Sequence, residues 1–110
     1  MSIPIVYFEI AGQDGAALQQ FYRDLFGWEI SDSASISSES TGGLPGGIRE
    51  DPADKVLYMG VSEIDEQLEK IVAGGGEVVL PRTVVEGVVT FALFRDPAGN
   101  LLGLAEIGSW

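Results

Sequence analysis

The sequence contains neither histidine nor cysteine. Zinc and non-haem iron are usually bound through these side chains, so conventional sites for both metals are excluded. The same absences exclude general acid–base catalysis by histidine, cysteine nucleophiles and serine triads that need histidine. Disulfides are excluded too, and we therefore expect a cytoplasmic protein.

Basic residues are also scarce. The chain has 6 Lys and Arg against 17 Asp and Glu, for a net charge of −11. Nucleic acids and anionic membrane surfaces attract clustered basic residues, whereas those of this chain are scattered along it. No run approaches the ~20 apolar residues that a membrane-spanning helix needs, and the N-terminus lacks the basic region of a signal peptide. We expect no nucleic-acid and no membrane partner.

The 110 residues, 45% of them hydrophobic, are typical of one globular domain over residues 1–110. β-Branched and aromatic residues at positions 3–10 predict a strand. Apolar residues at helical intervals predict a helix over residues 16–26. Asp14 is placed to cap its start, and Gly27 to end it.

Residues 31–54 have the weakest pattern. Six serines between positions 31 and 40 alternate loosely with other residues, which suits an exposed or edge strand pair. Four glycines predict a turn at residues 42–47. The acidic stretch 50–54 is the natural boundary between two modules, about residues 1–50 and about 55–110.

The second module restarts the pattern of the first. Val6 and Val56 begin equivalent strands, and each is followed by a helix that ends in glycine. Two such repeats can build one curved sheet with the helices outside. The elements expected in this half are a strand at 55–61, a helix at 65–73, and strands at 77–85 (interrupted at Pro81), 88–94 and 101–107.

An ordered set of motifs runs through both modules. It comprises Phe8-Glu9-Ile10, Phe21-Tyr22, Leu25-Phe26-Gly27-Trp28, Ile64-Asp65, Phe94-Arg95-Asp96-Pro97-Ala98-Gly99-Asn100 and Gly103-Leu104-Ala105-Glu106. In this set the chain resembles the vicinal oxygen chelate superfamily, which includes glyoxalase I, bleomycin-resistance proteins and extradiol dioxygenases. The resemblance implies an α+β fold, in which two βαβββ modules form a cupped mixed sheet with helices on its outer face, often as a homodimer.

The resemblance also implies where metal ligands would stand. Metal-dependent members take them from the first and last strands of each module, at positions that fall on Tyr7, Val56 and Gly103; residues 42–47 give no alignment for the fourth. Valine and glycine side chains cannot ligate a metal. We therefore expect no metal and no cofactor. The alternative is Mg²⁺ or Mn²⁺ held by oxygen ligands alone. The candidates for that set are Tyr7, Glu9, Glu39, Glu50 and Glu106.

Strand alternation predicts which side chains line the cup. The predicted ligand-pocket residues are Tyr7, Glu9, Val56, Tyr58 and Gly103, while Val6, Phe8 and Ile10 face the helices. An apolar floor with a few polar groups is typical of small-molecule sites.

Glu9 is the candidate catalytic residue, because a carboxylate in a cup can act as a base. It can equally lie in water, or pair with Arg95 or Arg49. Glu106 is expected to be solvated or ion-paired.

These observations favour a small-molecule-binding protein of the superfamily that has lost the usual metal site, in the manner of bleomycin-resistance proteins. A first alternative is a lyase or isomerase of the glyoxalase kind, or a dioxygenase-like enzyme, that uses oxygen ligands only. A second alternative is a non-catalytic structural or interaction module. Whether the chain is an enzyme, which ligand it takes and how a dimer would form are left open.

Overall fold

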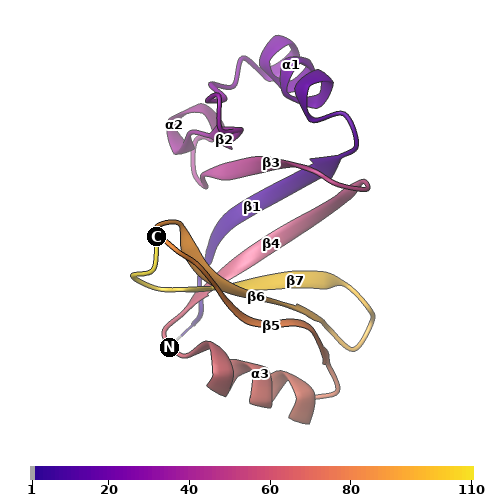
Figure 1. Cartoon of the computed structure of the whole chain (residues 1–110), viewed down its shortest axis with the longest axis vertical. Coiled ribbons are helices and arrows are strands. Elements are labelled where there is room, and N and C mark those ends of the chain that lie inside the picture. Colours follow the sequence, from indigo (N-terminus) through magenta and orange to yellow (C-terminus); the bar gives the residue numbers. More distant parts are fainter. Residues whose placement is uncertain (1) are drawn as a thin grey trace. The chain divides into compact units, whose positions relative to one another are not determined.

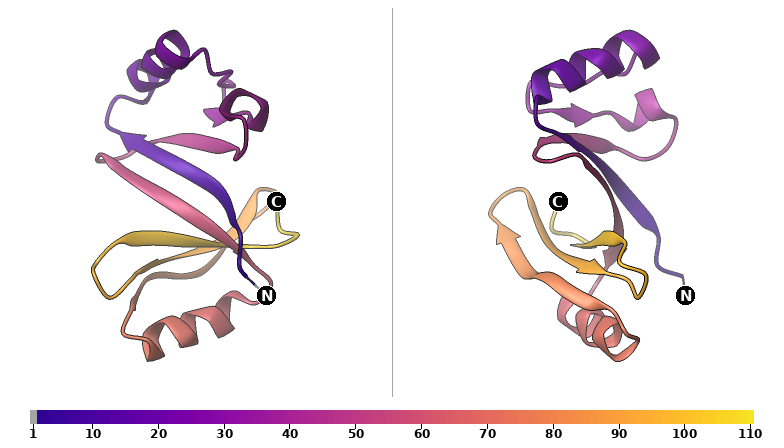
Figure 2. Two further views of the ribbon diagram at one scale, coloured as in Figure 1. Left: turned by 180° about the vertical axis from the view of Figure 1, so that it is seen from behind. Right: turned by 90° about the vertical axis from the view of Figure 1, so that its right-hand side faces the viewer.

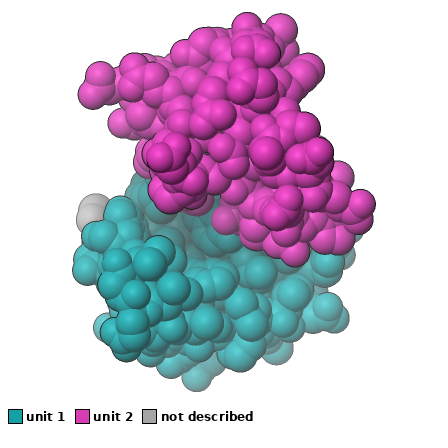
Figure 3. Space-filling view, turned by 45° about the horizontal axis from the view of Figure 1, so that its top comes forward, with its two compact units in different colours: residues 1–6, 57–110 teal, residues 7–56 magenta. Residues whose placement is uncertain are grey.

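The structure, a computed structural model, describes residues 2–110. The chain divides into two compact units (Figure 3). Unit 1 comprises Met1–Val6 with Leu57–Trp110, and unit 2 comprises Tyr7–Val56. That the chain is a single domain over residues 1–110 stays a prediction.

Unit 2 holds most of the first module (Figure 1). Its strand β3 pairs in parallel with β1 and antiparallel with β2, so that β3 lies between them. The elements are β1 (Ile5–Gly12), α1 (Gly15–Phe26), β2 (Ser35–Ile36), α2 (Ser38–Thr41) and β3 (Gly46–Glu50).

Unit 1 holds most of the second module. Here β4 pairs in parallel with β7. Strand β6 pairs in antiparallel fashion with β7 on one side and with β5 on the other. Helix α3 packs against β5, β6 and β7, and both views in Figure 2 show it along these strands. The elements are β4 (Asp54–Val61), α3 (Ile64–Ala73), β5 (Glu77–Val85), β6 (Val89–Arg95) and β7 (Leu101–Glu106). The predicted α+β class, with a mixed sheet built from two modules, is confirmed.

The long helices begin and end as the sequence predicts. The Asp14 carboxylate accepts a hydrogen bond from the Ala17 amide at 3.1 Å, and Gly27 is left-handed with φ 67°. Such caps satisfy backbone groups that the helix itself cannot pair. No described helix has the length and apolar character needed to cross a membrane.

The two helices contribute unequally to their cores. Helix α3 buries Ile64 and Leu68, which are 1% and 8% exposed, whereas the only buried residue of α1 is Gly15. Leu18 and Tyr22 pack partly against the core of unit 2. One cluster of buried residues in unit 1 comprises Val61, Ile64, Leu68, Ala92, Phe94 and Leu104, and one in unit 2 comprises Ile30, Ile36 and Ile48.

The apolar face predicted for α1 is therefore covered only in part. Phe21, Leu25 and Phe26 remain 55%, 58% and 56% exposed. We name these three side chains the α1 apolar patch.

Residues 31–47 depart from the prediction. The expected strand pair shrinks to β2 and one isolated bridge between Ile30 and Ile36. Residues 38–41 instead form a helical turn, because the Ser37 hydroxyl accepts from the Ser40 amide at 3.2 Å and caps it. The expected turn at residues 42–47 is also too long, since Gly46 and Gly47 already belong to β3.

Candidate functional site

The predicted pocket residues fall in both units. Tyr7, Glu9 and Val56 belong to unit 2, and Tyr58 and Gly103 to unit 1. The strand alternation behind the prediction holds in unit 2, where Phe8, between Tyr7 and Glu9, packs against the core beneath α1. The neighbouring positions 7 and 9 therefore point to the opposite face.

In unit 1 the ring of Tyr58 lies directly on Gly103. These residues are partners in the parallel β4–β7 register, and a Cβ at position 103 would overlap the ring. Phe91 meets the ring edge-on, with 6.4 Å between centroids and 64° between planes. Tyr58 is only 6% exposed and Val56 1%. Glycine at position 103 is thus required by the aromatic ring above it.

Unit 2 repeats this arrangement with different residues. Phe8 and Gly46 are partners in the parallel β1–β3 register, as are Glu9 and Gly47. A Cβ at Gly46 would overlap the Phe8 ring, and one at Gly47 would overlap the Tyr7 hydroxyl. The two glycines therefore accept aromatic side chains on opposite faces of β3.

Sequence reasoning missed the role of Gly47. The available signal was the internal repeat, since each module has a tyrosine on its first strand and a glycine on its last. Burial raises the pKa of the Tyr7 hydroxyl above its usual value of 10.0, and the charge of Glu9 raises it further. Tyr7 is therefore neutral at physiological pH, and its hydroxyl can donate or accept a hydrogen bond.

Glu9 forms an ion pair with Arg49, one of the two partners considered from the sequence. Arg49 Nη1 donates to Glu9 Oε1 at 2.5 Å, and the two side chains are 34% and 18% exposed. The other candidate, Arg95, donates to the Gly99 carbonyl at 3.0 Å.

Arg49 is shared by a second carboxylate. Its Nε lies 2.7 Å from Asp51 Oδ2, yet this buried nitrogen has no hydrogen-bond partner among the described residues. The short distance without bond geometry makes this contact one of opposite charges rather than a directed hydrogen bond. The face that carries Glu9 therefore has one guanidinium between two carboxylates.

The other candidate carboxylates are engaged separately. Glu50 Oε1 accepts from the Gly15 amide at 3.2 Å. Both carboxylate oxygens of Glu106 accept from Arg82, at 3.1 and 3.3 Å, as expected of an ion-paired residue. The hydrogen bond and charge of Glu106 raise the pKa of Arg82. Glu39 is exposed on α2.

The ligand positions implied by the family resemblance do not fit a divalent cation. Val56 and Gly103 carry no donor atom in their side chains, and the Tyr58 ring covers Gly103. Among residues 2–110, no three or more Asp or Glu side chains are grouped to hold a metal ion.

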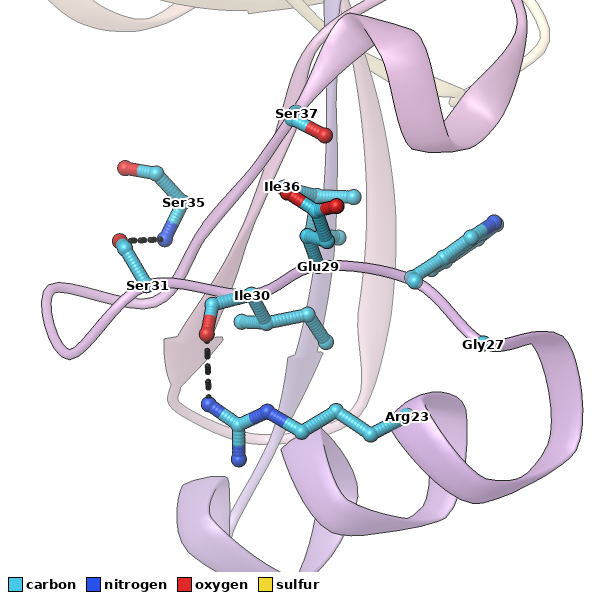
Figure 4. Close-up of a pocket in the computed structure, with 9 residues that line it drawn as sticks. Arg23, Gly27, Glu29, Ile30, Ser31, Ser35, Ile36 and Ser37 are labelled. Carbon is cyan, nitrogen blue, oxygen red and sulfur yellow. Dashed lines mark hydrogen bonds between the residues drawn. The ribbon is translucent and has the colours of Figure 1, made fainter.

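A separate cavity of about 630 Å³ lies in unit 2, where the chain leaves α1 and enters β2 (Figure 4). Its lining includes Arg23, Trp28 and Glu29, together with three serines. None of the predicted pocket residues lines it.

Comparison with known proteins identifies the family to which the chain belongs. The sequence profile of the Glyoxalase/Bleomycin resistance protein/Dioxygenase superfamily matches residues 5–104. The chain belongs to this superfamily, as its motifs indicated.

Two curated relatives are similar over most of the chain. CFP32 of Mycobacterium tuberculosis (strain CDC 1551 / Oshkosh), which is named provisionally as a glyoxylase, is 26% identical over 89% of the chain. The anthracycline biosynthesis protein DnrV of Streptomyces peucetius is 29% identical over 84%. In each case the match spans only 43% of the relative's length.

Solved structures confirm the fold. Hypothetical protein BH1468 of Bacillus halodurans C-125 is 12% identical, with a TM-score of 0.73 over 100% of this chain and 98% of that one. Methylmalonyl-CoA epimerase of Mycobacterium tuberculosis is 15% identical, with a TM-score of 0.65 over 93% and 86%.

Proposed function

We propose that the chain is a small-molecule-binding member of the superfamily that works without the metal ion of its metal-dependent relatives. Its pocket residues in this proposal are Tyr7, Glu9, Val56, Tyr58 and Gly103. The proposal includes a homodimer and a cytoplasmic location.

The observation that carries the proposal is that in each unit a tyrosine side chain fills the space next to a glycine, Tyr58 at Gly103 and Tyr7 at Gly47. A ligating carboxylate at position 103 would need the space that the Tyr58 ring occupies. In unit 2, the Tyr7 hydroxyl occupies the equivalent space above Gly47. Of the two tyrosines, half-buried Tyr7 keeps aromatic surface and a neutral hydroxyl, which are suited to holding an organic ligand by packing and hydrogen bonding.

The Glu9–Arg49 pair supports a binding role for Glu9 over a role as a base. A base must accept a proton from the substrate, whereas this carboxylate already accepts a hydrogen bond from a guanidinium at 2.5 Å. The pair offers both an acceptor and a donor to a ligand. Because the chain carries a net charge of −11, a ligand of low negative charge is favoured over a polyanion.

Native mass spectrometry of protein purified without added metal tests the absence of a metal and the dimer together. We expect a dimer that carries no divalent ion. One divalent ion per chain that disappears in Glu9→Gln would overturn the proposal and favour an oxygen-ligand site.

The binding role needs a ligand-dependent measurement. A metabolite library screened by thermal shift should yield a ligand whose affinity falls about tenfold in Glu9→Gln, the loss expected for one charge-assisted hydrogen bond. Glu39→Gln, an exposed carboxylate on another element, is the matched control. Equal affinity in wild type and Glu9→Gln would remove Glu9 from the pocket.

The name of the curated relative CFP32 favours one second candidate, a glyoxalase-like lyase or isomerase with Glu9 as its base. The measurement is turnover of the methylglyoxal–glutathione adduct by wild type and Glu9→Gln. A substantial activity that Glu9→Gln abolishes would establish the enzyme. Turnover that is unchanged in Glu9→Gln would exclude Glu9 as the base.

A further inference from the structure

The cavity in unit 2 is a second candidate binding site (Figure 4). Its volume, about 630 Å³, lies within the range of small-molecule sites in proteins, and the pocket is largely open to solvent. It lies between the end of α1 and the segment that leads into β2, and it shares no residue with the site proposed above. The inference therefore stands independently of the proposed function.

Trp28 is the large aromatic side chain of the cavity lining, and its neighbours hold it in place. Tyr22 stacks on it, with 5.4 Å between ring centroids and 22° between planes. Phe26 and Phe8 approach it at 5.1 and 6.0 Å. A ring fixed on several sides loses little conformational freedom when a ligand packs against its remaining surface.

The charged side chains that line the cavity sum to zero net charge. Arg23 and Glu29 contribute one positive and one negative side chain. Arg23 is fixed beside the cavity, because its Nη2 donates to the Ile30 carbonyl at 2.7 Å, as Figure 4 shows.

Three serines, Ser31, Ser35 and Ser37, complete the polar lining. Each hydroxyl can both donate and accept. The Ser31 hydroxyl already pairs with that of Ser33 at 2.9 Å, and the Ser37 hydroxyl donates to that of Ser40 at 2.8 Å, so a ligand would use their remaining hydrogen-bonding capacity. The Ser31 hydroxyl also accepts from the Ser35 amide at 3.1 Å, which ties the two sides of the turn together (Figure 4).

We propose that this cavity binds an uncharged saccharide ring. The apolar C–H face of such a ring packs against Trp28, and its hydroxyls pair with Glu29, Arg23 and the serines. An anion would be opposed by Glu29 and by the net charge of −11, and a cation by Arg23. A flat apolar ligand would cover the polar groups without pairing them, which costs free energy for each group left unsatisfied.

The chain supplies its own reporter for this test. Trp28 and Trp110 are its two tryptophans, so Trp110→Phe leaves Trp28 as the sole tryptophan, whose emission is excited selectively near 295 nm. This variant is titrated to ~0.1 M, a range that covers millimolar dissociation constants, with methyl glycosides of glucose, galactose and mannose and with N-acetylglucosamine. We expect a saturable change in Trp28 emission with at least one of them, and no change in Trp28→Phe, which reports through Trp110.

Two carboxylate variants in the Trp110→Phe background locate the site. Glu29→Gln should weaken saccharide binding about tenfold, because a hydrogen bond to a charged acceptor is lost. Glu39→Gln, on exposed α2 and outside the cavity lining, should bind as the parent does. Equal affinity in the two variants would contradict the assignment.

Amide chemical shifts give a second readout that does not depend on fluorescence. Binding at this cavity should move the amides of residues 29–37. No saturable change with any saccharide would overturn the proposal. So would shifts confined to other segments, or tighter binding of indole, a flat aromatic probe, than of every saccharide.

Discussion

The two units share a plan but differ in how they use it. Both begin with a strand, add a helix, and return a last strand that pairs in parallel with the first. The main cluster of buried residues in unit 1 has six members and its antiparallel strands are long, whereas the cluster in unit 2 has three members and its strand β2 has two residues. Unit 2 instead carries the Glu9–Arg49 pair, the aromatic cluster at Trp28 and the α1 apolar patch.

The difference indicates a division of labour within the chain. A dense core fixes backbone positions, and a loosely covered one leaves polar and aromatic groups accessible. We therefore expect unit 1 to be the more rigid of the two units, and unit 2 to leave more polar and aromatic groups accessible.

The helices give the largest expected contrast. Ile64→Ala in α3 removes a side chain that is 1% exposed and should lower the free energy of unfolding by about 3 kcal/mol. Phe21→Ala in α1 removes a side chain that is 55% exposed and should cost roughly 0.5 kcal/mol. Urea unfolding measures both. Similar costs would mean that α1 is covered by something, such as a second copy of the chain.

The two glycines beneath the tyrosines give the next contrast. Gly103→Ala puts a methyl group into the body of the Tyr58 ring, which is 6% exposed, and should cost about 2 kcal/mol. Gly47→Ala meets only the hydroxyl end of Tyr7, which can move aside, and should cost about 1 kcal/mol.

A double-mutant cycle checks the stated cause. The cost of Gly103→Ala should largely vanish in a Tyr58→Ala background. An unchanged cost there would show that backbone conformation, and not the ring, requires the glycine.

Substitutions in the ion pairs should produce a smaller difference in stability between the units. Glu9→Gln breaks a half-buried pair of 2.5 Å and should cost about 1 kcal/mol, because Arg49 keeps only the undirected contact with Asp51. Glu106→Gln breaks the more exposed pair with Arg82 and should leave the melting temperature within error of the parent. Equal shifts in the two variants would remove this contrast.

Left-handed backbone positions should respond in opposite directions in the two units. Ala34 of unit 2 has φ 65°, whereas the hairpin corner of unit 1 uses Gly87 with φ 73°. Ala34→Gly should stabilise by about 0.5 kcal/mol, since relief of strain exceeds the lost packing of one methyl group. Gly87→Ala should destabilise by about 1 kcal/mol, and chemical denaturation compares the two.

The smallest effect is expected at high pH. The pKa of Tyr7 is raised in the folded state, so the neutral hydroxyl is favoured there and stability is complete below the unfolded value of 10.0. Stability should fall as the pH rises from about 10 towards the folded pKa. Absorbance titration near 295 nm should lose a late-titrating component in Tyr7→Phe, and Glu9→Gln should shift that component to lower pH.

The sequence predicts those elements whose signals are local. α1 and α3 follow from apolar spacing and glycine ends, and Asp14 caps α1 as expected. Residues 31–47 were not predictable in this way. Gly46 and Gly47 are in a strand because aromatic side chains from β1 lie on them, and no pattern within the segment encodes that contact.

The candidate site was predictable to a similar degree. Period-two alternation separated Phe8 from Tyr7 and Glu9. It could not choose between Arg49 and Arg95 as the partner of Glu9, because that choice depends on strand register. The cavity at Trp28 depends on how a serine-rich turn closes, which composition does not specify.

The α1 apolar patch has a consequence for how the protein behaves in concentrated solution. At low ionic strength the charge of −11 keeps molecules apart over a Debye length of roughly 30 Å at 0.01 M salt. At 1 M salt that range contracts to roughly 3 Å, and contacts between exposed Phe21, Leu25 and Phe26 are no longer opposed. Repulsion between the acidic surfaces thus opposes association through the α1 apolar patch. Added salt screens this repulsion and should lower the solubility of the protein.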